Sequence, residues 1–403
     1  MVSLVFHGLF HEDHPASEAN YAVWTFVQLL MNAAQAKDYV ETVCGLDPGL
    51  PDADTLFWRL YECASLGLIL REYRKAVKRT IEAVKRRIRR RRFIIAIDET
   101  YEPVYGKIKN QWIHDYTNGV KGATGSYKYI AVSIVSGDLR FVILAIPIPK
   151  ISMETDYYVK ELLIFVKSLI PIETVLLDRG FYTWGVIKVL KELKLRYIIL
   201  VPKYDKFKEW LKKGAGLHEH RGILYREKTK YEISTYIAVL PDYKGFDWIF
   251  ASNIEYEKIF SYVRYYKKRW GIETTFRVQD EVRIKTKSLR PLIRFALFLF
   301  ECMLYNLWQF FKGRVPFRRF VNILFRRSIV KTAVFAVIAL FREKGFLDDK
   351  APPPGKIFEV SIEKFAEYTI CDEFMEKMLD YICLKRLKYL LLLSFPKSIR
   401  RYR

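Results

Sequence analysis

Cysteine is scarce in this chain of 403 residues, and its placement excludes two classes of protein. The five cysteines include no CxxC pair and form no even-numbered framework: Cys44, Cys63, Cys302, Cys371 and Cys383. Zinc ribbons need closely spaced cysteine pairs, and secreted disulfide scaffolds need a dense, even set. The fold must therefore be stabilised by an apolar core, for which 51% hydrophobic residues in a chain of this length suffice.

Acidic residues are also in short supply relative to basic ones. The chain has 68 Lys and Arg against 45 Asp and Glu, which gives a net charge of +23. Such an excess implies a polyanionic partner, and nucleic acid is the commonest one. An anionic membrane surface is the competing explanation.

The basic residues are densest between positions 71 and 92, where twelve Lys or Arg accompany two Glu. Apolar residues recur there at helical spacing: Leu70, Tyr73, Val77, Ile81, Val84 and Ile88. This pattern predicts a helix with one apolar stripe beneath a basic face. We interpret the run, which ends in Arg89, Arg90, Arg91 and Arg92, as a phosphate contact. A solvated surface helix and a membrane-lying helix are the alternatives.

The middle of the chain alternates between strand and helix patterns. Apolar runs at 93–97, 174–177 and 197–201 predict buried strands. A hairpin of strands is expected over 129–148, and the apolar residues of 155–169 recur with helical periodicity. Two of these runs end in a carboxylate, Asp98 and Asp178. Both are therefore expected at the carboxyl edge of a mixed α/β sheet, where such folds place their sites. A turn or capping role is the alternative for either one alone.

A further carboxylate lies in the stretch 262–287, which has the length and composition of one long helix. Five polar residues share one face of that helix: Tyr266, Arg269, Glu273, Arg277 and Asp280. A salt-bridged surface would explain them in isolation. Together, however, Asp98, Asp178 and Glu273 make three hard oxygen ligands, a set that Mg²⁺ or Mn²⁺ prefers. In a strongly basic protein, this favours metal-assisted phosphodiester chemistry.

These residues resemble the motifs of DDE-type insertion-sequence transposases. Asp98 lies in FIIAIDET, Asp178 in LLDRGFY and Glu273 in YYKKRWGIETTFR. The spacing of Tyr266, Arg269 and Glu273 is similar to the first three letters of the family's Tyr-Arg-Glu-Lys signature. The fourth letter departs, since Asp280 stands near the position of the lysine. The resemblance covers about residues 93–310 and implies an RNase H-like catalytic domain with a β-rich insertion at about 203–253.

The resemblance also implies a mechanism. Asp98, Asp178 and Glu273 would hold two Mg²⁺ or Mn²⁺ ions for cleavage at transposon ends and for strand transfer into target DNA. Lys285 or Lys287 would replace the family lysine. The residues that would contact the DNA around the metal ions are Tyr266, Arg269, Arg277, Arg179 and Lys285. The partners implied are double-stranded DNA and a second copy of the chain in a synaptic homodimer, in the cytoplasm with the nucleoid.

The expected organisation is a helical, basic DNA-binding region at 1–92, the catalytic domain at 93–310 and a helical C-terminal region at 311–403. The apolar stretch 291–311 is long enough to cross a membrane. Arg294 and Glu301 interrupt it, so we interpret it as a buried helix and expect no membrane partner. Two other functions stay open: a stand-alone metal-dependent DNA nuclease of the same fold, and a catalytically inactive DNA-binding relic.

Overall fold

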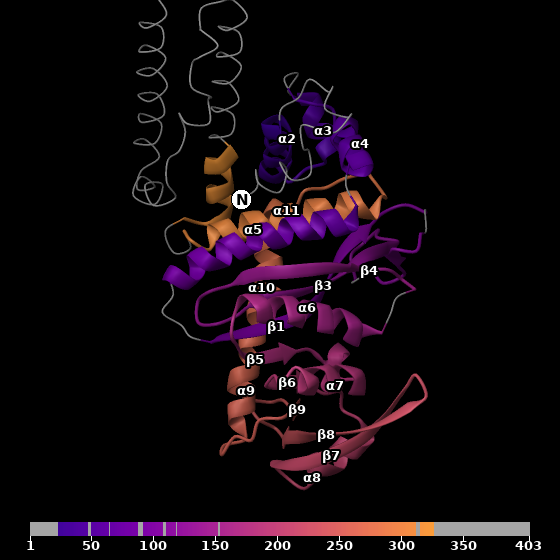
Figure 1. Cartoon of the computed structure of the whole chain (residues 1–403), viewed down its shortest axis with the longest axis vertical. Helices are drawn as coiled ribbons and strands as arrows, with labels where there is room; N and C mark the ends of the chain where they lie inside the picture. The colour runs from indigo at the N-terminus through magenta and orange to yellow at the C-terminus, as the bar shows by residue number, and fades with distance from the viewer. Residues whose placement is uncertain are drawn as a thin grey trace, which may run out of the picture.

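A computed structural model of the chain describes residues 23–46, 50–63, 65–87, 92–107, 110–117, 119–151, 154–311 and 315–325. Most of the expected C-terminal region, 311–403, lies outside these ranges, as do Arg89, Arg90 and Arg91 of the basic run. Figure 1 shows the described elements stacked from the N-terminal helices, across a mixed sheet, to a β-rich end.

The N-terminal part is helical, as the sequence predicts. It comprises α2 (Val23–Ala36), α3 (Val40–Val43), η2 (Cys44–Leu46), α4 (Ala53–Cys63) and α5 (Leu66–Arg87). The basic helix α5 buries Tyr73, Val77 and Ile81 of its predicted stripe, whereas Ile88 lies outside the described residues. The Tyr73 hydroxyl donates a hydrogen bond of 3.2 Å to the carbonyl of Val142 in the sheet. One continuous core therefore joins these helices to the central sheet.

The sheet has nine strands: β1 (Phe93–Val104), β2 (Ile113–His114), β3 (Gly125–Ile134), β4 (Phe141–Ile148), β5 (Ile172–Leu177), β6 (Tyr197–Leu200), β7 (Gly216–Arg226), β8 (Thr229–Leu240) and β9 (Trp248–Ser252). Their order is β2-β3-β1-β5-β6-β9-β8-β7, with β4 also paired to β3. β1, β5 and β6 are parallel, and β3 and β4 form the predicted antiparallel hairpin. The run β4-β3-β1-β5-β6 has the strand order of an RNase H-like sheet, so the expected fold class is confirmed.

The two faces of this sheet are covered by different helices. Ile95 and Ile97 of β1 join the core shared with α6 (Thr155–Leu169) and α7 (Trp184–Glu192). Ile94 and Ala96 join a second core that contains Tyr262, Tyr266 and Ile272. Since successive residues of a strand point to opposite faces, the uninterrupted apolar run of β1 follows from burial on both sides.

The β-rich segment after Lys203 extends the main sheet. It begins with a short helix, α8 (Asp205–Lys212), and its last strand, β9, pairs antiparallel with β6. β8 and β7 then continue outward from β9. The insertion expected at about 203–253 is therefore β-rich as predicted, but it includes a helix that the polar composition did not suggest.

The apolar stretch near residue 300 forms α11 (Pro291–Trp308), and it is long and apolar enough to cross a membrane by length and composition. In the fold 72% of that window is buried. Asn306 exchanges hydrogen bonds of 2.8 Å with both the backbone N–H and the carbonyl of Val142. We therefore interpret α11 as a core helix that lies between the N-terminal helices and β4 (Figure 1).

Candidate active site

The first two carboxylates lie next to each other on neighbouring parallel strands. β1 pairs with β5 as far as Ile97 and Leu177, so Asp98 and Asp178 follow at the same level. Contrary to expectation, β1 does not end at Asp98. It continues to Val104 because every residue from Ile95 to Val104 pairs with β3 on its other side. Asp98 therefore sits within a strand, where only the parallel pairing stops.

The third carboxylate comes from a helix that is shorter and less regular than predicted. The stretch 262–287 divides into α9 (Phe260–Tyr266), η4 (Lys267–Arg269), α10 (Trp270–Gln279) and η5 (Asp280–Val282). The helix does not continue beyond Val282, and two residues further on the backbone N–H of Ile284 is bound by the Glu301 carboxylate rather than by the preceding turn. The prediction of one helix to residue 287 is wrong, yet Arg269 and Glu273 remain one turn apart.

Arg269 lies between the three carboxylates and contacts each of them. Its Nη1 donates a hydrogen bond of 2.9 Å to Oδ2 of Asp98. Its Nη2 donates to Oε1 of Glu273 and lies 3.9 Å from Oδ1 of Asp178. The Tyr266 hydroxyl donates to the same Asp178 oxygen at 3.1 Å. The structure thus brings together all three predicted carboxylates and the two predicted residues that precede Glu273.

The electrostatics of this cluster are those of crowded acids around one buried cation. The side chain of Arg269 is 6% exposed and that of Asp98 is 13% exposed. Burial raises the pKa of Asp98 to about 7, against the opposing effect of Arg269, and the charges of Asp178 and Glu273 add to the rise. Burial alone would lower the pKa of Arg269, but Tyr266 and the three carboxylates raise it overall. Arg269 is therefore fully charged, and it offsets the repulsion between the acids.

The donor set fits a divalent cation in type and charge, because three carboxylates supply hard oxygen ligands. Its arrangement is different from that of a metal centre. Within the described parts of the chain, no three His, Cys, Asp or Glu side chains surround one common point. The guanidinium of Arg269 fills the middle of the cluster, and its buried Nε has no hydrogen-bond partner. A metal ion would therefore replace contacts that Arg269 now makes.

The other predicted DNA-contacting residues lie around this cluster rather than in it. Arg277 is exposed on α10 one turn after Glu273, and Arg179 is exposed in η3 (Arg179–Phe181), directly after Asp178. Lys285 and Arg92 are also exposed. Asp280, which stands near the position of the family lysine, forms an ion pair of 2.5 Å with Arg283.

A hollow of about 280 Å³ adjoins the cluster between the second half of β1 and the end of α10. Glu99, Tyr101, Arg277 and Arg283 are among the residues that line it. Glu99 is held by an ion pair of 2.7 Å to Lys128 on β3. Glu99, Tyr101 and Arg283 are not among the site residues predicted from the sequence. The sequence does contain a signal for Arg283, because it lies three residues after Asp280, at the spacing of a helical ion pair. It contains none for the Glu99–Lys128 pair, because Lys128 lies near Glu99 only through the pairing of β3 with β1.

Fold and site together define a class: an RNase H-like domain with two carboxylates where the parallel pairing of β1 and β5 stops and a third on a following helix. A family model described as the transposase DDE domain matches residues 78–307, more than half of the chain. The chain therefore belongs to the transposase DDE domain family. Among solved structures, it is similar to a cryo-EM structure of the piggyBac transposase synaptic complex with hairpin DNA.

That similarity has a TM-score of 0.51 at 13% sequence identity and covers 92% of this chain and 81% of the other. At this identity the likeness shows the fold alone. No curated protein sequence matches the chain.

Proposed function

We propose that this protein is a DNA transposase that cleaves DNA at transposon ends and joins the freed 3′ end to target DNA, using Mg²⁺ or Mn²⁺. The observation that carries the proposal is the convergence of Asp98, Asp178 and Glu273, from three separate elements, on the buried side chain of Arg269. Family membership supports a transposase, and the net charge of +23 supports a nucleic-acid substrate.

Asp98, Asp178 and Glu273 would hold the metal ions. When bound, divalent ions activate the attacking oxygen and stabilise the leaving oxygen of an in-line phosphoryl displacement. Asp98 must be ionised to act as a ligand. The Tyr266 hydroxyl fixes the orientation of Asp178 by donating to one of its oxygens, which leaves the other free. The guanidinium of Arg269, once released from the carboxylates, offers a bidentate fork for the scissile phosphate. Arg179 and Arg277 are exposed at the rim of the cluster and would hold the flanking phosphates.

The protein is also proposed to act as a homodimer on double-stranded DNA. The structure to which it is similar is a transposase synaptic complex with hairpin DNA. The described residues of one copy hold one cluster of catalytic carboxylates, so two copies would provide one cluster for each of two paired transposon ends.

The first test is the cleavage of end-labelled duplex DNA that carries the element's own flanks, with Mg²⁺, Mn²⁺ or EDTA. We expect metal-dependent cutting at the element ends that is lost in Asp178→Asn, Asp98→Asn and Glu273→Gln, while duplex binding is largely retained. Asp205→Asn is the matched control, because Asp205 is an exposed carboxylate that pairs with Lys208. Full cleavage by the three site variants would refute the assignment of the site.

Strand transfer separates the transposase from a stand-alone nuclease. A pre-cleaved end with a free 3′-OH is incubated with supercoiled plasmid, and joined products are counted by amplification across the junction. Joined products support the transposase, and cleavage without any joining would support the nuclease. Duplex binding without cleavage in the presence of either metal would support the third reading, a catalytically inactive DNA-binding relic.

A further inference from the structure

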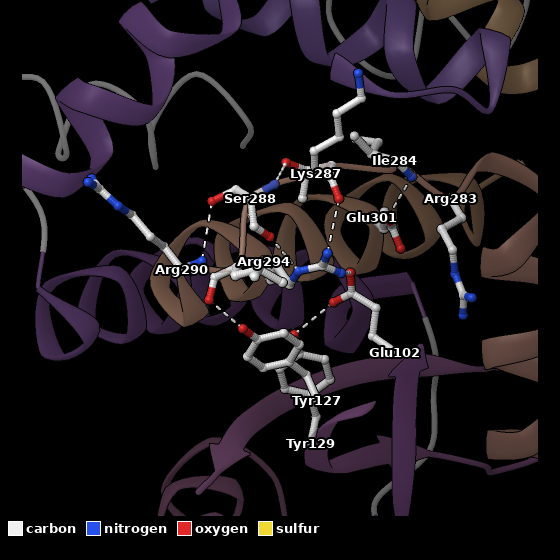
Figure 2. Close-up of polar contacts among 12 residues, drawn as sticks. Glu102, Tyr127, Tyr129, Arg283, Ile284, Lys287, Ser288, Arg290, Arg294 and Glu301 are labelled. Atoms are coloured by element: carbon white, nitrogen blue, oxygen red, sulfur yellow. Dashed lines mark hydrogen bonds and ion pairs between the residues drawn. The ribbon is translucent and has the colours of Figure 1, made fainter. Parts of the chain in front are cut away.

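The segment between η5 and α11, residues 283–290, is an extended strap with a regular alternation of side chains. Ile284 and Thr286 are buried, while Lys285 and Lys287 are exposed. Arg290, at the end of the strap, is also exposed. Figure 2 shows Lys287 and Arg290 extending away from α11, on which the strap lies. The strap thus presents its cations on one side and its anchoring groups on the other.

Two ionisable side chains of α11, Arg294 and Glu301, hold the strap from beneath. The buried Arg294 donates hydrogen bonds to the carbonyls of Ser288 (2.7 Å) and Thr286 (3.0 Å). Its third contact is an ion pair of 2.7 Å with Glu102 of β1, four residues beyond Asp98. The Glu301 carboxylate accepts from the backbone N–H of Ile284 at 2.7 Å. Figure 2 shows these contacts converging on the strap from the helix and the sheet.

The N-terminal helical region holds the same strap from another side. The backbone N–H of Val40 donates to the carbonyl of Lys285 at 3.0 Å, and the N–H of Lys285 donates to the carbonyl of Asp38 at 3.1 Å. One oxygen of Glu41 accepts from the Thr286 hydroxyl (2.7 Å) and from the N–H of Lys287 (2.8 Å). The backbone of the strap is therefore fixed at nearly every residue by groups that lie far away in the sequence.

The outward cations are positioned but not neutralised. Lys285, Lys287 and Arg290 form no ion pair with a carboxylate in the described part of the chain. Lys285 lies 5.6 Å from the ring centre of Tyr39, and Arg290 lies 4.0 Å from that of Tyr61, which is itself 53% exposed. These rings limit the movement of the two cations without cancelling their charge. Cations fixed in this way lose little conformational entropy when an anion binds.

We propose that the strap cations, Lys285, Lys287 and Arg290, form a preformed docking row for the sugar–phosphate backbone of duplex DNA. The inference rests on the proposed function and deepens it. The row begins directly after the helix that carries Glu273, and it is bonded to β1 through Arg294 and Glu102, so DNA on the row is held in a fixed position relative to the catalytic carboxylates. It is also bonded to the N-terminal helices, so one DNA segment contacts both parts of the chain.

Salt dependence of binding tests the row directly, because each phosphate contact contributes about 0.9 to the slope of log K against log salt concentration. The probe is a fluorescein-labelled duplex of mixed sequence, followed by anisotropy from low to moderate salt. We expect the triple variant Lys285→Gln, Lys287→Gln and Arg290→Gln to bind more weakly, with a slope shallower by about 2 to 3. Because the substituted side chains are exposed, the thermal midpoint is expected to stay unchanged.

A charge-matched triple variant elsewhere provides the control: Lys160→Gln, Lys212→Gln and Lys213→Gln, all exposed residues of α6 and of the end of α8. It loses the same net charge and should keep most of the slope. The conservative variant Lys285→Arg, Lys287→Arg and Arg290→Lys should restore the wild-type slope. Equal slopes for the strap and control triples would overturn the docking row while the transposase proposal stands. A wild-type protein that binds no duplex at all would overturn both.

Discussion

Replacing Arg269 by methionine tests the central electrostatic feature of the candidate site. The wild-type guanidinium is the shared cation of Asp98, Asp178 and Glu273, and the Arg269–Asp98 pair is the buried part of the cluster, with side chains 6% and 13% exposed. Two unit charges about 4 Å apart attract by about 4 kcal/mol at the effective dielectric constant of about 20 that suits protein sites. Glu273 is half exposed and adds little.

The expected loss is about 3 kcal/mol of unfolding free energy in EDTA at pH 8, in the range for removing one partner of a buried ion pair. At the usual unfolding entropy of about 2.1 cal/mol/K per residue, this corresponds to a fall of about 4 °C in the thermal midpoint of a chain of 403 residues. Mn²⁺ should then stabilise the variant more than the wild type, because in the wild type the ion must first displace Arg269. Arg277→Met is the control: Arg277 lies about two turns further along the chain, on α10, and has no ion pair with any described residue.

The assay is a thermal melt of both variants and the wild type, in EDTA and over a MnCl₂ titration, with binding followed in parallel by calorimetry. An Arg269→Met protein that is as stable as the wild type in EDTA would refute the shared-cation reasoning. So would equal Mn²⁺-induced shifts for the two proteins, since the ion would then meet no competition from Arg269.

Three further predictions concern the groups around the site. Burial raises the pKa of Glu301 to about 8, in surroundings that include Arg283, Glu102 and Asp280. Between pH 4.5 and 8 the folded state therefore keeps a proton on Glu301 that the unfolded state has lost. The unfolding free energy of the wild type should fall as the pH rises through this range. Glu301→Gln keeps an oxygen for the Ile284 N–H and should remove that part of the fall. Denaturant titrations at several pH values measure the unfolding free energy of both proteins, and parallel curves of this free energy against pH would contradict the prediction. Asn306→Leu should lower the unfolding free energy by about 2 to 4 kcal/mol. The substitution leaves the buried Val142 N–H without its partner and removes one of the hydrogen bonds to the Val142 carbonyl. A thermal midpoint equal to that of wild type would contradict a core position for α11. Gly222→Ala should destabilise by about 1 to 3 kcal/mol, because an added Cβ would lie 1.9 Å from the Trp184 ring. Gly45→Ala is the milder control, because an added Cβ there meets open space and the backbone does not have a positive φ.

The fold and the three carboxylates could be predicted from the sequence because each leaves a local signal. An apolar run that ends in Asp, as in 93–98 and 174–178, marks a stretch of strand buried on both faces and the point where that burial stops. Parallel pairing then places Asp98 beside Asp178 without further information. The spacing of Arg269 and Glu273 likewise fixes their common face, even though a 3-10 turn interrupts the helix between α9 and α10.

The contacts that the sequence could not predict are those made across long separations. Nothing local indicates that Arg269 pairs with Asp98, 171 residues earlier in the chain. The strap is a stronger example, because 283–287 has no helix-breaking residue and its sequence therefore predicts a continuation of the Glu273 helix. It is extended because its backbone groups bond to Asp38, Val40, Glu41 and Glu301 instead of to the preceding turn. Tertiary hydrogen bonds overrode the local helical tendency.

The buried charges of α11 have a role that stability alone does not explain. Burying an ion pair such as Arg294–Glu102 costs several kcal/mol of desolvation for each charge, and well-packed apolar residues in its place are often at least as stable. Apolar residues, however, could not bind the carbonyls of Thr286 and Ser288, and the strap would lose its fixed path. The charges that interrupt the apolar stretch 291–311 are thus the groups that hold Lys285, Lys287 and Arg290 in place. The same residues that argue against a membrane helix in the sequence therefore connect the core of the protein to its proposed DNA-binding surface.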